Sequence, residues 1–139
     1  MKSGWYNNEY VVVKPLKNGH RQSLVMGVYH NNSGRWDVFA GVFSSNATFH
    51  SIANSDVWTT VSSTNKNPSI KVLSLALEAL GEIEQEIHNH ANGKRAFLYV
   101  DGMDERRLRV YTKVLTKKCG YKKSSVRSRC GLPLLYKRV

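Results

Sequence analysis

The sequence predicts a single α+β domain in which a mixed β-sheet is flanked by two main helices. Three observations lead to this prediction. Residues 1–63 contain β-rich runs separated by turn residues, whereas an apolar pattern with a period of 3.6 residues begins at Pro68. A short, wholly apolar run follows at 96–100. A length of 139 residues is typical of one domain and sufficient for a hydrophobic core. We therefore expect antiparallel strands in 1–63 and a helix-strand-helix-strand-strand order in 68–139.

The first half of the chain is predicted to form an antiparallel meander. Its three strands are expected where β-branched and aromatic residues concentrate, at 10–15, 23–30 and 36–43, and a short fourth strand is expected at 57–62. Asn18 and Gly19 supply the positive φ angles that a tight hairpin turn requires between the first two strands. The polar stretch 44–56 has one possible helical turn, around 47–53.

The second half begins with the longest predicted helix. Asn67 is its expected N-cap, Pro68 suits the first helical position, and Asn92-Gly93 is a natural stop. One apolar stripe recurs at steps of three or four residues and consists of Leu73, Ala76, Leu77, Leu80, Ile83 and Ile87.

The run 96–100 is expected to be a central strand, buried on both faces of a partly parallel sheet. Asp104 then caps a second helix, which Gly120 ends. The inner stripe of this helix is predicted to be Leu108, Tyr111, Leu115 and Cys119, with Val114 on its flank. Two short strands, at 121–126 and 132–138, close the chain.

The net charge of +11 arises entirely from the C-terminal segment. Residues 105–139 contain twelve Lys and Arg but only one acidic residue, whereas residues 1–104 contain nine of each sign. Charge gathered on one segment concentrates anionic partners, so we expect CoA, a nucleic acid or an acidic protein to bind there. The expected contacts to a nucleic acid are Arg107, Arg109, Lys117, Lys118, Lys122, Lys123, Arg127 and Arg129.

Several classes of protein are disfavoured. The N-terminus lacks the apolar run of a signal peptide or a spanning helix, which favours a cytoplasmic protein that is not secreted and does not enter a membrane. Cys119 and Cys130 are then expected as thiols rather than a disulfide. We find no zinc spacing, P-loop or nucleophile elbow, and we expect no metal.

The segment 100–111, Val-Asp-Gly-Met-Asp-Glu-Arg-Arg-Leu-Arg-Val-Tyr, resembles the fifth strand and fourth helix of the GNAT (general N-acetyltransferase) superfamily. In that family a capping Asn or Asp is commonly followed seven residues later by Tyr, as Asp104 is by Tyr111. The family's Gly-aromatic pair at the helix end is present as Gly120-Tyr121, about one helical turn later than usual. The resemblance covers roughly the last seventy residues and implies a GNAT-like mixed sheet.

The resemblance implies transfer of an acyl group from acetyl-CoA to an amine. Tyr111 would be the acid that protonates the departing thiolate, and Asp101, just past the central strand, is a candidate base beside His50, His88 and His90. The expected cofactor contacts are Lys66, the helix-start amides of Ser69 and Ile70, and Arg106. The sequence departs from the family pattern at 64–71, where relatives carry glycines and this chain has none.

Two alternatives remain open at the level of sequence. A GNAT-like domain without catalysis could serve as a nucleic-acid-associated or assembly protein through its basic C-terminal segment, and Tyr111 would then be a core aromatic on the inner stripe of its helix. RNase H-like nucleases share a similar order of elements, but they require a carboxylate on the first central strand. Residues 10–14 contain none, which disfavours nuclease activity, although Glu78 or Glu82 and Asp101 could imitate the other carboxylates.

Overall fold

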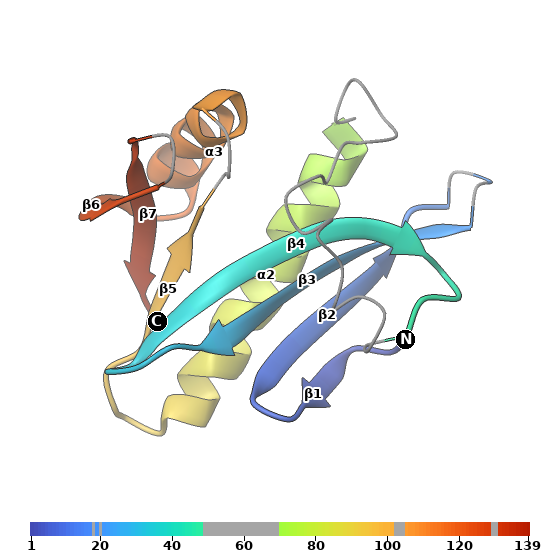
Figure 1. Ribbon diagram of the computed structural model, residues 1–139, viewed down its shortest axis with the longest axis horizontal. Coiled ribbons are helices and arrows are strands. Elements are labelled where there is room, and N and C mark those ends of the chain that lie inside the picture. Colours follow the sequence, from blue (N-terminus) through green and yellow to red (C-terminus); the bar gives the residue numbers. More distant parts are fainter. Residues whose placement is uncertain (18, 20, 49–69, 102–104, 129–130) are drawn as a thin grey trace.

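The computed structural model describes residues 1–17, 19, 21–48, 70–101, 105–128 and 131–139. Within the helices, the side chains at positions 70, 71, 105–108, 110 and 111 lie outside the description. The described chain forms a mixed sheet of seven strands and two helices (Figure 1), which confirms the α+β class. The elements are β1 Gly4–Tyr6, β2 Glu9–Pro15, β3 Gln22–His30, β4 Arg35–Ser44, α2 Ile70–Ala91, β5 Phe97–Val100, α3 Glu105–Lys118, β6 Lys122–Arg127 and β7 Pro133–Arg138.

The strands lie in the order β1-β2-β3-β4-β5-β7-β6. Strands β1 to β4 form an antiparallel meander, and β5, β7 and β6 pair antiparallel to one another. A parallel pairing of Arg35–Val38 in β4 with Phe97–Val100 in β5 joins the two groups. The predicted meander and the central, partly parallel position of β5 are therefore confirmed.

The parallel pair β4 and β5 is short and opens toward its carboxyl ends. Its registered pairs stop at Val38 and Val100, yet β4 continues to Ser44. Strand β5 ends at Val100, where Figure 1 shows β4 and β5 pointing apart, with α3 near the end of β5. The geometry creates a distinctive position in the sheet, because ligands of open α/β sheets commonly bind at the carboxyl ends of adjacent parallel strands.

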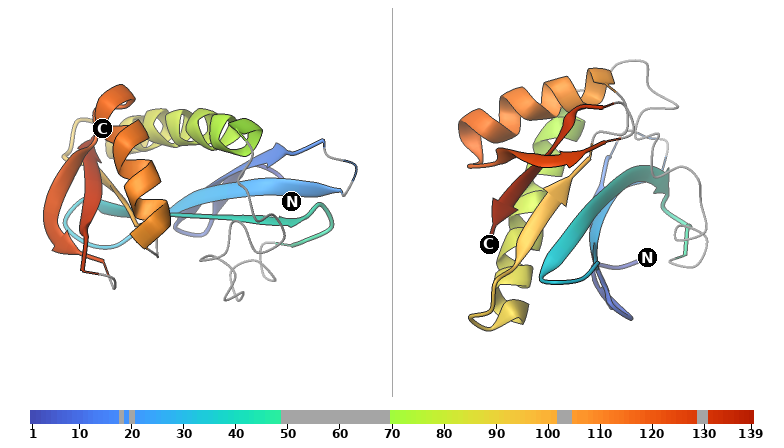
Figure 2. Two further views of the ribbon diagram at one scale, coloured as in Figure 1. Left: turned by 90° about the horizontal axis from the view of Figure 1, so that it is seen from above. Right: turned by 60° about the vertical axis from the view of Figure 1, so that its left-hand side comes forward.

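Both described helices cover the same face of the twisted sheet (Figure 2). Helix α2 packs on β2 and β3 through the predicted stripe, within which Leu80, Ile83 and Ile87 are buried. Helix α3 contributes Leu115 to the same core. The sheet side of this core consists of Val12, Met26, Val28, Trp36, Leu98, Val100 and Leu135.

The face of the sheet away from the two helices is here called the open face. Val11 and Val25 are buried there under Met1, Phe39 and Ala47. Strand β3 is consequently covered on both faces, and its residues from Ser23 to Val28 are all buried.

The prediction that 96–100 is buried on both faces is wrong. Ala96, Leu98 and Val100 are buried beneath the helices, but Phe97 and Tyr99 on the open face are only half-buried. The reason is that both crossover helices follow the same side of the sheet, so an apolar run next to them is covered on one face only.

The helix ends follow the sequence. Helix α2 ends at Ala91, and Asn92 and Gly93 take positive φ angles of 50° and 86°. After α3, Gly120 has a φ of 79°, and the backbone amide of Tyr121 donates to the carbonyl of Leu115. Glycine permits the left-handed backbone with which the chain turns back on the end of the helix.

Three details differ from the prediction or fall beyond it. Strand β1 was not predicted, because three residues carry too little pattern. At the first hairpin the Leu16 amide donates to the Gln22 carbonyl and Gly19 has the expected positive φ, whereas Asn18 lies outside the described residues. The possible helical turn at 47–53, the strand 57–62 and the caps Asn67-Pro68 and Asp104 lie wholly or mainly outside the described residues.

Neither described helix is both long and apolar enough to cross a membrane.

Candidate functional site

Among the residues predicted to be catalytic or to bind the cofactor, Asp101 is described with its side chain, and it lies where β5 ends beside β4. Asp101 follows the last residue of β5 and is half-buried on the open-face side of the alternation. Helix α3 begins at Glu105, so the backbone of Tyr111 lies within it. The side chains of Tyr111, Arg106 and Ile70 are outside the described part, as are Lys66 and Ser69 entirely. The structure therefore places the side chain of Asp101 and the backbone of Tyr111, and the phosphate cradle lies outside the described residues apart from the backbone of Ile70.

The two histidines at the end of α2, His88 and His90, lie away from Asp101. His90 packs its ring against Trp5 and Trp36, with centroid distances of 4.6 and 5.6 Å. Trp36 pairs with Leu98 near the start of β5, whereas Asp101 follows its end. His88, like His90, is exposed in the last turn of α2, and His50 lies outside the described residues. His88 and His90 are therefore unsuitable as bases beside Asp101.

Four lysines form what we call the basic cluster, defined as Lys117, Lys118, Lys122 and Lys123. The turn at 119–121 brings the end of α3 and the start of β6 together, so these predicted residues lie close along the chain on exposed surface. None of the four has an acidic partner in the described part of the chain. Arg109 is exposed further up α3, and Arg127 donates to the carbonyl of Gly131 at 3.4 Å. The side chain of Arg107 and all of Arg129 lie outside the description.

The acidic residues of α2 are already engaged elsewhere. Glu82 binds the Lys14 amine at 2.7 Å, and this hydrogen bond raises the pKa of that amine. Glu84 binds Lys137 at 2.6 Å, and Glu86 accepts a hydrogen bond from the Trp5 indole at 2.9 Å. Because these carboxylates are satisfied by groups outside the basic cluster, its charge is not neutralised by them.

Tyr121, the aromatic of the Gly-aromatic pair, is a core residue. It is 2% exposed, and its hydroxyl has no hydrogen-bond partner among the described groups. Burial, followed by the charge of Glu84, raises its pKa, so the phenol is neutral at physiological pH. The Lys137 amine lies 5.6 Å from the ring centroid. The pair Gly120-Tyr121 thus ends α3 and anchors the chain in the core.

Sequence reasoning missed a group of aromatic and basic residues on the open face. Phe97, Tyr99 and Tyr136 lie there on adjacent strands, and the Arg35 guanidinium lies 4.4 Å from the Tyr99 ring centroid. The sequence contained a sign of this surface, because Phe97 and Tyr99 alternate with the aliphatic residues of the run 96–100. Tyrosine tolerates partial exposure to water better than leucine or valine does. The overall apolarity of the run obscured this sign.

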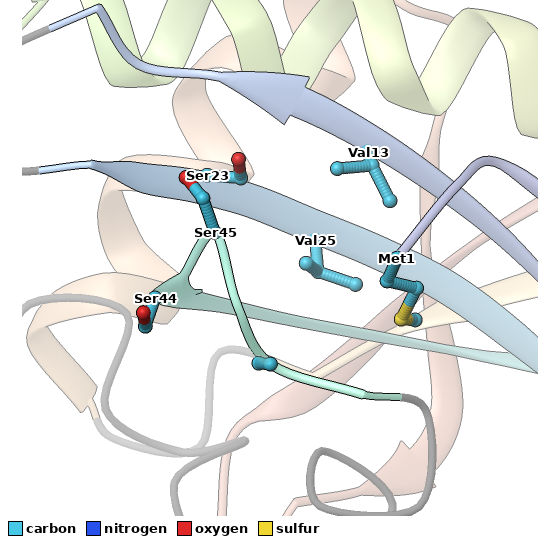
Figure 3. Close-up of a pocket in the computed structure, with 7 residues that line it drawn as sticks. Met1, Val13, Ser23, Val25, Ser44 and Ser45 are labelled. Atoms are coloured by element: carbon cyan, nitrogen blue, oxygen red, sulfur yellow. The ribbon is translucent and has the colours of Figure 1, made fainter.

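A small pocket also opens on this face (Figure 3). Met1, Val13 and Val25 line it together with Ser23, Ser44, Ser45 and Ala47. Its volume of about 20 Å³ accommodates roughly one water molecule, far less than a nucleotide or CoA requires. It is a packing defect beside the cluster of Val11 and Val25 rather than a ligand site.

No three His, Cys, Asp or Glu side chains in the described part of the chain are arranged to hold a metal ion. Glu78 and Glu82, which could imitate nuclease carboxylates, both face Lys14. Cys119 is a half-buried free thiol.

Comparison of the chain with protein-family models, with curated proteins and with solved structures finds no match.

Proposed function

We propose that this chain is a GNAT-like acyltransferase that moves an acyl group from CoA to an amine. The observation that carries the proposal is the single parallel pairing within the described sheet, between β4 and β5, whose strands diverge at their carboxyl ends. The strand order and the two crossover helices on one face are compatible with a GNAT-like fold. The extended arm of CoA carries amide groups, and the edges of two separating strands offer backbone groups that can form hydrogen bonds with them.

The proposed roles follow from position. Asp101, at the end of β5, accepts a proton from the attacking amine, and Tyr111 in α3 donates one to the departing thiolate. Lys66, the amides of Ser69 and Ile70, and Arg106 hold the cofactor phosphates. The start of α2 supports this assignment because unpaired amide protons and the helix dipole attract anions there.

The test combines binding with turnover. Calorimetry is expected to show saturable binding of CoA and acetyl-CoA to the full chain. Release of the CoA thiol in the presence of a panel of primary amines should then fall about 100-fold or more in Tyr111→Phe, with CoA affinity preserved, because general acid catalysis has that magnitude. Tyr6→Phe is the matched control, since its hydroxyl donates to the Lys2 carbonyl at the far edge of the sheet. Absence of CoA binding, or full activity of Tyr111→Phe, would contradict the proposal.

A second candidate function is association with nucleic acid through the basic cluster. The observation in its favour is that four exposed lysines meet at one turn while the nearby acids of α2 bind other groups. A cation without an internal partner can neutralise a backbone phosphate and release its condensed counterion. This function does not require catalysis and is compatible with a phosphate loop that lacks glycine.

Salt dependence tests this second candidate. The logarithm of the affinity for duplex DNA is expected to fall linearly with the logarithm of the salt concentration. The double variant Lys117→Gln/Lys118→Gln should reduce the magnitude of this slope by about 2. The control Lys2→Gln/Lys17→Gln removes the same charge from exposed sites elsewhere. Equal slopes in the two double variants would show that the cluster makes no specific phosphate contacts.

A further inference from the structure

A row of side chains crosses the open face along directly paired positions of five strands. In the registers, Tyr29 of β3 faces Asp37 of β4, and this row continues through Tyr99 of β5 and Tyr136 of β7 to Lys122 of β6. Paired residues point to the same side of a sheet. A second row runs beside it through Arg35, Phe97 and Arg138.

The aromatic rings in these rows contact one another. Tyr99 and Tyr136 are stacked, with centroids 5.7 Å apart and an angle of 22° between ring planes. Phe97 lies 6.4 Å from Tyr136. We call Phe97, Tyr99, Tyr136 and Arg35 the aromatic surface.

The aromatic surface remains partly open to solvent. Phe97, Tyr99 and Tyr136 are half-buried, whereas Leu98 and Leu135, their neighbours on the helix-covered face, are completely buried. Contiguous aromatic groups that stay partly open to water commonly mark a binding site.

The position of Arg35 is set by an acid. Its guanidinium binds Asp37 at 2.9 Å and is held over Tyr99, with 30% of its side chain exposed. This pair neutralises its own charge, but the planar guanidinium remains a stacking group. It extends the flat surface formed by the two tyrosines.

Unneutralised cations border the aromatic surface at one end of the sheet. Arg138 ends β7 and pairs with Phe97, while Lys122 begins β6 and pairs with Tyr136. Lys94 and Arg95 lie in the connection just before β5. All four are exposed and have no acidic partner among the described residues. Among the described acids of the open face, Asp37 lies beside Tyr99 but is paired with Arg35, Glu9 lies in β2, and Asp101 follows the other end of β5.

We infer that the aromatic surface binds single-stranded nucleic acid. Unpaired bases stack on aromatic rings and on guanidinium planes, and the strand's phosphates reach the bordering cations. A duplex buries its base faces and could use only the cations. Flat rings and guanidinium groups, rather than aliphatic side chains, favour this ligand over an apolar protein surface. The inference goes beyond acyl transfer and deepens the second candidate function, on which it rests for the class of partner.

The direct test compares single-stranded with double-stranded probes. A fluorescent oligothymidine of about 12 nucleotides and a duplex of equal length, titrated with the full chain, report affinity by anisotropy. Tyr99→Leu/Tyr136→Leu is expected to weaken single-strand binding about tenfold or more and leave duplex binding unchanged, because each stacked base contributes on that scale. Trp5→Leu, an exposed aromatic on the opposite face, is the matched control and should bind normally.

A second measurement uses the natural sequence and so does not depend on the folding of a variant. Photo-crosslinking to an oligonucleotide that carries 5-iododeoxyuridine should attach the strand to Phe97, Tyr99 or Tyr136, as located by mass spectrometry. Adducts confined to other segments would overturn the inference, as would an unchanged single-strand affinity in a folded Tyr99→Leu/Tyr136→Leu variant. Duplex binding without preference for the single strand removes the inference but preserves the second candidate, whereas absence of all nucleic acid binding removes both. Neither result affects the CoA measurement.

Discussion

Gly34→Ala is expected to lower the free energy of unfolding by about 3 kcal/mol, because a left-handed backbone and a steric clash both oppose the added methyl group. Gly34 has a φ of 78°, and its added Cβ would overlap the carbonyl oxygen of Arg95. That oxygen belongs to the backbone and cannot move aside as a flexible side chain would. The Gly34 carbonyl also accepts a hydrogen bond from Phe97 at 2.9 Å, so the change disturbs the start of β5.

Gly93→Ala separates these two contributions. Gly93 has a similar φ of 86°, but its added Cβ would meet nothing within 4 Å. Its substitution should therefore cost only the backbone strain, about 1 kcal/mol. Urea unfolding followed by circular dichroism measures both values. Equal losses in the two variants would show that the close approach of Gly34 to Arg95 contributes nothing to the junction between β4 and β5.

Ile83→Ala is expected to lower the free energy of unfolding by about 2 to 5 kcal/mol, the range for truncating a large side chain in a well-packed core. Ile83 is 0% exposed and lies in the cluster that joins α2 to both halves of the sheet. Truncation removes buried apolar contacts and leaves a cavity that surrounding side chains fill incompletely. The same denaturation experiment measures the loss.

The opposite face of α2 provides the control for this substitution. Gly81 is exposed in the helix interior, and a methyl group there would meet nothing within 4 Å. Gly81→Ala should therefore raise the free energy of unfolding by about 0.5 to 1 kcal/mol, because alanine loses less backbone entropy than glycine. A loss of stability in Gly81→Ala, or a tolerated Ile83→Ala, would contradict the placement of the buried stripe.

Local patterns were sufficient for several elements of the fold. The stripe of Leu80, Ile83 and Ile87 faces the core, and Asn92-Gly93 and Gly120 end their helices with positive φ angles. These features depend on residues within one or two helical turns. Strand β1 was missed because its pairing with β2, rather than its own three residues, defines it.

The candidate site was less accessible from sequence. The lysines of the basic cluster were recognised by charge alone, and the structure places them at one turn. The aromatic surface was not recognised, since Arg35, Tyr99 and Tyr136 are far apart in sequence and meet only through the pairing of β4, β5 and β7. Asp101 was located by its position after a strand, but its proximity to the divergence of β4 and β5 depends on which strand lies beside β5.

The amino-acid sequence by itself determined the class of fold, the main helices and the concentration of positive charge after Glu105, because periodicity, glycine placement and composition act over short distances. Tertiary structure decided which face of each strand is covered. Both helices pack on one side, so Leu98 is buried whereas Tyr99 beside it is half-exposed. An alternating strand specifies two faces, and only the packing of distant elements decides which of them water reaches.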